Sequence, residues 1–113
     1  MHELSICRNI LDIVLEQAAT DGFSRVERIG LEVGPFAGIE IEALRFGFDV
    51  VTKGSLAEGA RLDIHETAGT ARCADCGAST VLLRRFDPCP QCGSHNLRVT
   101  GGEDLRVKEL EVT

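Results

Sequence analysis

The feature that most constrains this chain of 113 residues is a pair of Cys-x-x-Cys motifs, Cys73/Cys76 and Cys89/Cys92. Each motif places two thiolates on one tight turn, so two such turns brought face to face supply four sulfurs at the corners of a tetrahedron. Four thiolates fill the coordination shell of a zinc ion and leave no open position for a substrate. The spacing therefore predicts a structural zinc site and places the function of the protein elsewhere.

The residues around the two motifs favour the same interpretation. Gly77 and Gly93 follow the pairs and suit turns that need a positive φ, while Pro90 stiffens the second turn. The alternatives are two disulfides, a dithiol redox site, or chance spacing of the cysteines. A redox site uses one pair at a strand-to-helix junction, whereas here two pairs lie within a short segment. Disulfides need an oxidising compartment, and the amino terminus shows neither a basic leader nor a cleavage site, so we expect a cytoplasmic protein.

The charge of the chain argues against a surface that follows nucleic-acid phosphates. The formal net charge is -6, whereas non-specific affinity for nucleic acids comes mainly from Lys and Arg. Arg84, Arg85 and Arg98 form only a weak basic patch, which we interpret as a solvated face of the zinc lobe. No segment is long enough to cross a membrane. We therefore expect neither nucleic acid nor a membrane as a partner.

The first part of the chain has the pattern of a helix. Hydrophobic residues recur at three- and four-residue steps between Leu4 and Ala19, which predicts an amphipathic helix. Gly22 is placed to end it in the left-handed conformation. The fifth cysteine, Cys7, lies on the apolar stripe and is interpreted as a core residue, with an accessory metal ligand or a reactive thiol as the alternative.

The middle of the chain has the pattern of a strand-helix-strand unit. Apolar residues alternate over 29–33 and over 60–64, as expected for strands with one buried face. Between them, 40–52 has the periodicity of a helix. Such a unit predicts parallel pairing of the two strands, with His65 facing outward.

A final strand is predicted over 105–112, with a slip in its alternation at Lys108-Glu109 that indicates a bulge. We expect it to return to the amino-terminal sheet. The predicted fold class is α+β: a small mixed β-sheet of about three strands packed with two α-helices, with an inserted zinc-ribbon lobe. The expected domains are 1–68, completed by the C-terminal strand 103–113, and a zinc-binding ribbon domain over 69–102.

The amino terminus is a candidate for a second metal site. Met1-His2-Glu3 combines a free amine, an imidazole and a carboxylate. An N-terminal amine with an adjacent His can also recruit deprotonated backbone amide nitrogens, and four in-plane nitrogens favour Ni(II) or Cu(II) over zinc. On this chemistry alone, a solvated terminus remains the alternative.

Several motifs taken together resemble the HypA/HybF family, the nickel metallochaperones of hydrogenase maturation. The resemblance covers essentially the whole chain, in order and at family-like spacing. It rests on Met1-His2-Glu3-Leu4-Ser5, the loop Gly34-Pro35-Phe36-Ala37-Gly38-Ile39-Glu40, Leu44-x-Phe46-x-Phe48, Glu58-Gly59-Ala60-x-Leu62, Cys73-x-x-Cys76 and Cys89-Pro90-x-Cys92-Gly93.

The resemblance implies a nickel ligand set. The family's first residue matches Met1, its essential histidine matches His2, and the adjacent acid matches Glu3. An acidic residue after the Gly-rich loop matches Glu40. The family's zinc ligands match the four cysteines of the two motifs.

One histidine departs from the pattern of some relatives, which place histidines beside the cysteine pairs. Here His95 lies three residues past Cys92, and the first pair has none. We interpret His95 as a solvent-exposed residue or a neighbour of the zinc ligands, and the departure from the pattern argues against a pH-driven exchange of ligands at the zinc.

The family resemblance also implies a function and partners. The chain is expected to bind Ni(II) as transient cargo beside structural Zn(II), and to deliver nickel to the precursor of a [NiFe]-hydrogenase large subunit with the help of a HypB-like GTPase. It is not expected to be an enzyme. The identity of the hydrogenase, a urease as a further recipient, and the choice between monomer and homodimer stay open. The rival classes are a zinc-ribbon module that binds nucleic acid or protein, and a zinc hydrolase, for which the chain has no three-ligand open site.

Overall fold

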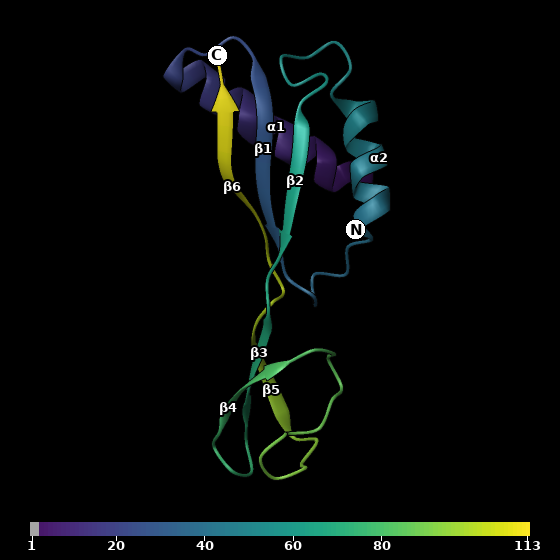
Figure 1. Cartoon of the computed structure of the whole chain (residues 1–113), viewed down its shortest axis with the longest axis vertical. Helices are drawn as coiled ribbons and strands as arrows, with labels where there is room; N and C mark the ends of the chain where they lie inside the picture. Colours follow the sequence, from purple (N-terminus) through teal and green to yellow (C-terminus); the bar gives the residue numbers. More distant parts are fainter. Residues whose placement is uncertain (1–2) are drawn as a thin grey trace. The chain divides into compact units, whose positions relative to one another are not determined.

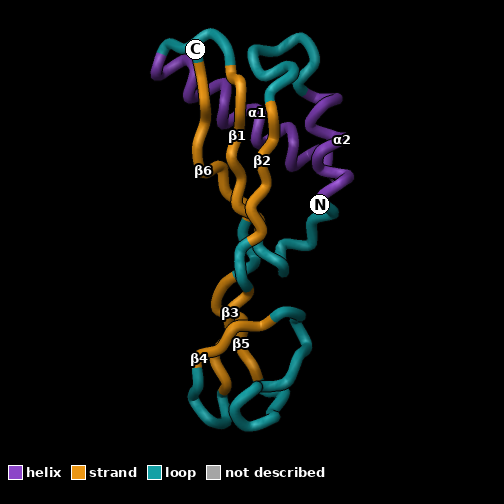
Figure 2. Tube along the Cα trace, viewed as in Figure 1, coloured by secondary structure: helices purple, strands orange, loops and turns teal. Residues whose placement is uncertain are grey.

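The structure is a computed structural model that describes residues 3–113. Two α-helices and six β-strands lie within that range (Figures 1 and 2). Their bounds, in chain order, are α1 Glu3–Asp21, β1 Val26–Val33, α2 Ile41–Val51, β2 Arg61–Glu66, β3 Gly69–Cys73, β4 Ser79–Leu82, β5 Leu97–Gly101 and β6 Leu105–Val112. The strands form two sheets of three, with the orders β2-β1-β6 and β4-β3-β5.

The chain divides into two compact units. We call the first the helix unit; it consists of the residues up to Leu31, Ile39–Ile64 and Val107–Thr113. The second, the cysteine unit, consists of Glu32–Gly38 and His65–Arg106. The domain boundaries expected at 68 and 103 stay a prediction. None of the helices in the described range is long and apolar enough to span a membrane.

The amphipathic helix predicted between Leu4 and Ala19 is confirmed as α1. It ends where Gly22 takes a φ of 77° and donates its N–H to the Ala18 carbonyl at 2.8 Å, the left-handed cap that the sequence predicted. One stripe of the helix is buried, and its residues supply much of the core of the helix unit: Cys7, Ile10, Leu11, Val14 and Ala18.

The second predicted helix is confirmed as α2, with its two end residues acting as caps. Glu40 is the N-cap: its Oε1 accepts the N–H of Glu42 at 3.0 Å. At the other end Thr52 is 2% exposed, and its hydroxyl donates to the Phe48 carbonyl at 2.7 Å. Between the caps the buried residues are Leu44, Gly47 and Phe48.

The first sheet is mixed, as predicted. Thr113 donates to the Arg25 carbonyl at 2.9 Å, so the end of β6 meets the start of β1 and this pair is antiparallel. β1 and β2 are joined through α2 and run in the same direction (Figure 1), so the strand-helix-strand unit has the predicted parallel pairing. The return of the last strand to the amino-terminal sheet is thereby confirmed. The bulge expected at Lys108-Glu109 stays a prediction, although both residues are exposed in succession.

Charged side chains connect the three strands of this sheet. Arg28 on β1, with a side chain 15% exposed, forms ion pairs with Asp63 of β2 at 3.1 Å, Glu109 of β6 at 2.9 Å and Glu111 of β6 at 3.2 Å. The hydrogen bond that Arg28 donates to Glu109 is the main cause that raises the pKa of Arg28, and burial partly offsets this effect. One arginine therefore forms ion pairs with carboxylates from both outer strands.

The second sheet is antiparallel throughout. β3 pairs with β4 through Thr70↔Val81 and Arg72↔Ser79, and with β5 through Arg72↔Arg98. The register to β5 shifts between Thr70 and its neighbour Ala71, where the strand carries an irregularity. β3 leads directly into the first cysteine motif, so the sheet positions the metal-binding turns.

Candidate metal centre

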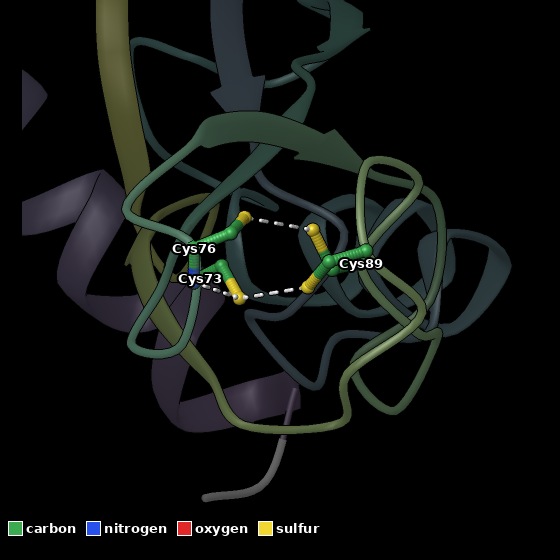
Figure 3. Close-up of side chains that lie close together, drawn as sticks. Cys73, Cys76 and Cys89 are labelled. Carbon is green, nitrogen blue, oxygen red and sulfur yellow. Dashed lines mark hydrogen bonds between the residues drawn. The ribbon is translucent and has the colours of Figure 1, made fainter.

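The four cysteines of the two motifs lie together. Cys73 ends β3 and Cys76 follows in the next turn, while Cys89 and Cys92 belong to the loop between β4 and β5. Their sulfurs all lie within 4.8 Å of one another. The Cys73 and Cys92 sulfurs are 3.6 Å apart, and those of Cys76 and Cys89 are 3.8 Å apart. In Figure 3 the labelled side chains bring their sulfurs toward a common centre.

These distances fit a metal ion. Zinc bonded to four sulfurs at about 2.3 Å holds them about 3.8 Å apart, whereas a disulfide brings two sulfurs to about 2.05 Å. All five cysteines of the chain are free thiols. Cys73 and Cys89 are 1% and 2% exposed, while Cys76 and Cys92 reach the surface. The cluster therefore has the size and the donor set of a tetrathiolate site and is not built as two disulfides.

The turns that carry the sulfurs have the predicted geometry. Gly77 has a φ of 77° and Gly93 a φ of 76°, so both predicted positive φ angles are confirmed. Each glycine N–H donates back to the first cysteine of its motif, to the Cys73 carbonyl at 2.9 Å and the Cys89 carbonyl at 2.8 Å. The N–H of Cys76 also points at the Cys73 sulfur, 3.5 Å away. These hydrogen bonds close the backbone of each turn around its cysteine pair.

The pKa values of two of the thiols, Cys73 and Cys92, favour a bound cation. The Cys76 amide lowers the pKa of Cys73 to about 7. The pKa of Cys92 is raised to about 12: the Ser94 amide lowers it, but desolvation and the three neighbouring sulfurs outweigh that effect. One thiolate is therefore stabilised by the turn, and a full set of four needs a positive charge at the centre.

A polar bridge between the two turns was not found by reasoning from the sequence. Asp75, inside the first motif, accepts hydrogen bonds from the Ser94 hydroxyl at 2.5 Å and the Asn96 amide at 3.4 Å. Both bonds lower the pKa of Asp75. The Ala74 N–H adds a bond to the Asn96 carbonyl at 2.9 Å. The only sequence signal was the polar pair Ser94 and Asn96 just after the second motif, and nothing in the spacing indicated its partner.

The predicted nickel ligands are placed in part. Met1 and His2 lie outside the described residues. Glu3 is the first residue of α1 and is half-buried, and Glu40 is the exposed N-cap of α2. Both carboxylates belong to the helix unit, whose two helices pack against each other.

One hydrogen bond between α1 and α2 lies one helical turn from both Glu3 and Glu40. The fully buried Cys7 donates its thiol to the Leu44 carbonyl at 3.3 Å. Burial raises the pKa of Cys7, and the charge of Glu3, one turn earlier on α1, raises it further. Leu44 in turn lies one turn after Glu40 and donates its N–H to the Glu40 carbonyl. Glu3 and Glu40 therefore each lie one helical turn from the Cys7–Leu44 contact. The prediction that Cys7 is a core residue is confirmed.

The remaining histidines stand apart from the cysteines. His65 is exposed, as predicted, and so is His95. Within residues 3–113, the four cysteines are the one group of three or more His, Cys, Asp or Glu side chains close enough to hold a metal ion.

The fold and the sulfur cluster together define a small α+β protein with a four-cysteine metal centre. This chain belongs to the HypA family: the family described as "Hydrogenase/urease nickel incorporation, metallochaperone, hypA" matches residues 1–112. The resemblance noted in the sequence is thereby confirmed.

Similar proteins agree with this assignment. Proteins named "Hydrogenase maturation factor HypA" from Azotobacter vinelandii and Alkalilimnicola ehrlichii are 58% and 53% identical over 112 residues, which cover 99% of each chain. The solution structure of the Ni metallochaperone HypA from Helicobacter pylori has the same fold, with a TM-score of 0.73 at 24% identity. That match covers 99% of this chain and 97% of the other, so the whole described fold is shared.

Proposed function

We propose that this protein is a nickel metallochaperone that acts in the cytoplasm. It binds Ni(II) at its amino terminus and delivers the ion to the precursor of a [NiFe]-hydrogenase large subunit, together with a HypB-like GTPase. Its role is that of a carrier and not of an enzyme. The observation that carries the proposal is the family match over residues 1–112, which begins with Met1-His2-Glu3.

The proposed nickel ligands are Met1, His2, Glu3 and Glu40. The amine and imidazole at the first two positions, with intervening amide nitrogens, are donors that Ni(II) prefers. Glu3 and Glu40 are supported by their common distance of one helical turn from the Cys7–Leu44 contact. A terminal site suits transfer because an incoming ligand can displace its donors one at a time without unfolding a core.

We further propose that the ion held by the four cysteines is Zn(II) and that its role is structural. Cys73, Cys76, Cys89 and Cys92 would hold it, and four thiolates leave no position for a reacting molecule. When bound, the ion supplies the positive charge that four ionised sulfurs need, and it joins two turns that are otherwise linked by the hydrogen bonds of Asp75 and by the bond from the Ala74 N–H to the Asn96 carbonyl.

A nickel titration of zinc-loaded protein tests the terminal site. The native chain is compared with the same chain extended by one Gly ahead of Met1, because the extension removes the primary amine from its position beside His2. We expect the extension to abolish nickel binding while zinc content and thermal stability stay unchanged. Equal binding by both proteins would exclude the amine as a ligand.

A substitution and a pH series complete the test. His2→Ala should also abolish nickel binding and keep the zinc; loss of both metals would contradict two separate sites. Because the amine, amide and imidazole bind in their deprotonated forms, nickel affinity should fall as the pH drops toward and below the imidazole pKa of about 6.5. Affinity that is indifferent to pH across this range would reject the ligand set.

A further inference from the structure

The sheet of the cysteine unit has one face that its own core does not use. Ala71, Cys73 and Leu82 point to the buried side and are at most 2% exposed. The alternate residues of these strands share the other face. Two observations show this: the register pairs Thr70 with Val81 and Arg72 with Ser79, and the hydroxyls of Thr100 and Thr70 form a hydrogen bond. We call this the open face; its residues are Thr70, Arg72, Ser79, Val81, Arg98 and Thr100.

Two like charges stand opposite each other on the open face. Arg72 and Arg98 are register partners on neighbouring strands, and both are exposed. Like charges placed directly opposite across a sheet are unfavourable unless an anion lies between them. Among residues 3–113 neither arginine forms an ion pair, and none of the six open-face positions is acidic. This is an unneutralised cationic surface in a chain whose net charge is -6.

The structure changes which arginines form the basic patch. The sequence pointed to Arg84, Arg85 and Arg98. Arg85, however, is occupied: it lies 5.1 Å from the ring centre of Phe36 and forms an ion pair with Glu103 at 3.1 Å. Arg72 takes its place as the neighbour of Arg98, because the register of β3 and β5 brings the two together.

The surroundings of the arginine pair suit a peptide. A pocket of about 280 Å³ lies at the pair and is lined also by Cys73, Ala74 and Gly77. On the same face Val81 is 59% exposed, and along the chain Leu83 and Phe86 are 83% and 86% exposed. Guanidinium groups bind carboxylates through paired hydrogen bonds, and exposed apolar side chains add contact area.

We propose that the open face is a docking surface for an acidic segment of a partner protein. Carboxylates of the segment bind between Arg72 and Arg98, and an apolar residue of the segment contacts Val81. Charge complementarity carries this assignment, because the face offers two free cations and no anion. The inference goes beyond nickel binding and does not depend on it.

The arginines have a second possible role, which the test must separate from docking. They lie near a sulfur cluster that is negatively charged when it is ionised. Arg72 and Cys73 are adjacent on one strand, however, so their side chains point to opposite faces. If the arginines balanced the sulfur charge, their reversal would weaken metal binding; if they bind a partner, it would not.

The probe is a short fluorescent peptide in which Glu and Val alternate, titrated into the full chain loaded with zinc and free of nickel. The test variant is Arg72→Glu/Arg98→Glu. The control is Arg8→Glu/Arg106→Glu, which changes the net charge equally at exposed positions that are not part of the open face. We expect the test variant to weaken peptide binding by at least about tenfold and the control by less than about twofold. Val81→Ser should weaken binding without changing its salt dependence.

Zinc content and the absorption spectrum of the Co(II)-substituted protein report on folding of the cysteine unit, and both should match the unsubstituted chain in all variants. Four results would overturn the proposal: no binding of the acidic peptide at millimolar concentration, equal loss in the two double variants, loss of zinc on reversal of the arginines, or tighter binding of a thymidine oligonucleotide at the same face. A fifth result, salt-sensitive dimers that disappear with Arg72→Glu/Arg98→Glu, would also overturn the proposal and assign the face to a second copy of the chain.

Discussion

The side chain of Glu109 on β6 lies over Gly30 on β1. A Cβ atom at Gly30 would be 2.9 Å from Glu109 Cγ, and the same side chain accepts the bond from Arg28 at 2.9 Å. Gly30 therefore provides the space through which a carboxylate of β6 reaches the guanidinium of β1. A glycine inside a strand often marks such a close approach.

Gly30→Ala should lower the free energy of unfolding by about 1–2 kcal/mol, because the methyl group displaces Glu109 from Arg28. Urea denaturation of the metal-loaded protein measures this loss. The control is the same substitution made together with Glu109→Ala, where the methyl group has room and should cost less. If the losses in the free energy of unfolding caused by Gly30→Ala and Glu109→Ala are simply additive, Gly30 does not provide the space for the Arg28–Glu109 ion pair.

Cys73→Ser should remove the metal and unfold the cysteine unit, since a structural metal site contributes its binding energy to folding. The helical circular dichroism should remain, because α1 and α2 both belong to the helix unit. Metal content and far-ultraviolet spectra measure the two effects. Cys7→Ala is the matched control, with the metal kept; a protein that retains its metal after Cys73→Ser would contradict the tetrathiolate site.

The buried thiol of Cys7 should make the helix unit sensitive to alkali. Burial, and then the charge of Glu3, raise the pKa of Cys7 in the folded chain. Folding thus favours the neutral thiol. Its contribution to the free energy of unfolding is complete at pH values below the pKa of about 8.5 in the unfolded chain, and it is lost as the pH rises through the higher pKa of the folded chain. Unfolding of the metal-loaded protein should show a larger loss of stability above this pH than unfolding of Cys7→Ala. Parallel pH curves for the two proteins would contradict this effect.

Two substitutions at Glu40 separate its cap from its proposed role as a nickel ligand. Ser caps a helix without a carboxylate, so Glu40→Ser should keep the stability of the native chain, whereas Glu40→Ala should lose about 1 kcal/mol. Both should weaken nickel binding if the carboxylate is a ligand. Thermal unfolding and nickel titration measure the two effects, and native nickel affinity in Glu40→Ser would restrict Glu40 to the cap.

The local features of this protein follow from neighbouring residues alone. The apolar stripe of α1, the alternation in β1 and the glycine after each cysteine motif act within a few residues, so periodicity and turn chemistry were enough to predict them. The four-cysteine centre could be predicted for the same reason, because each pair is closed by its own turn. The family resemblance likewise rested on motifs that can be seen along the chain.

Tertiary structure alone decided which side chains meet across those elements. Three groups of residues meet although they lie far apart in the chain: Arg28 with its three carboxylates, Asp75 with Ser94, and Arg72 with Arg98. Their contact depends on strand register and on how two turns are joined. A shift of register by one residue moves every side chain to the other face, and apolar alternation specifies the face of a strand without specifying its partner residue. The open face of the cysteine unit could therefore be recognised only in the folded protein.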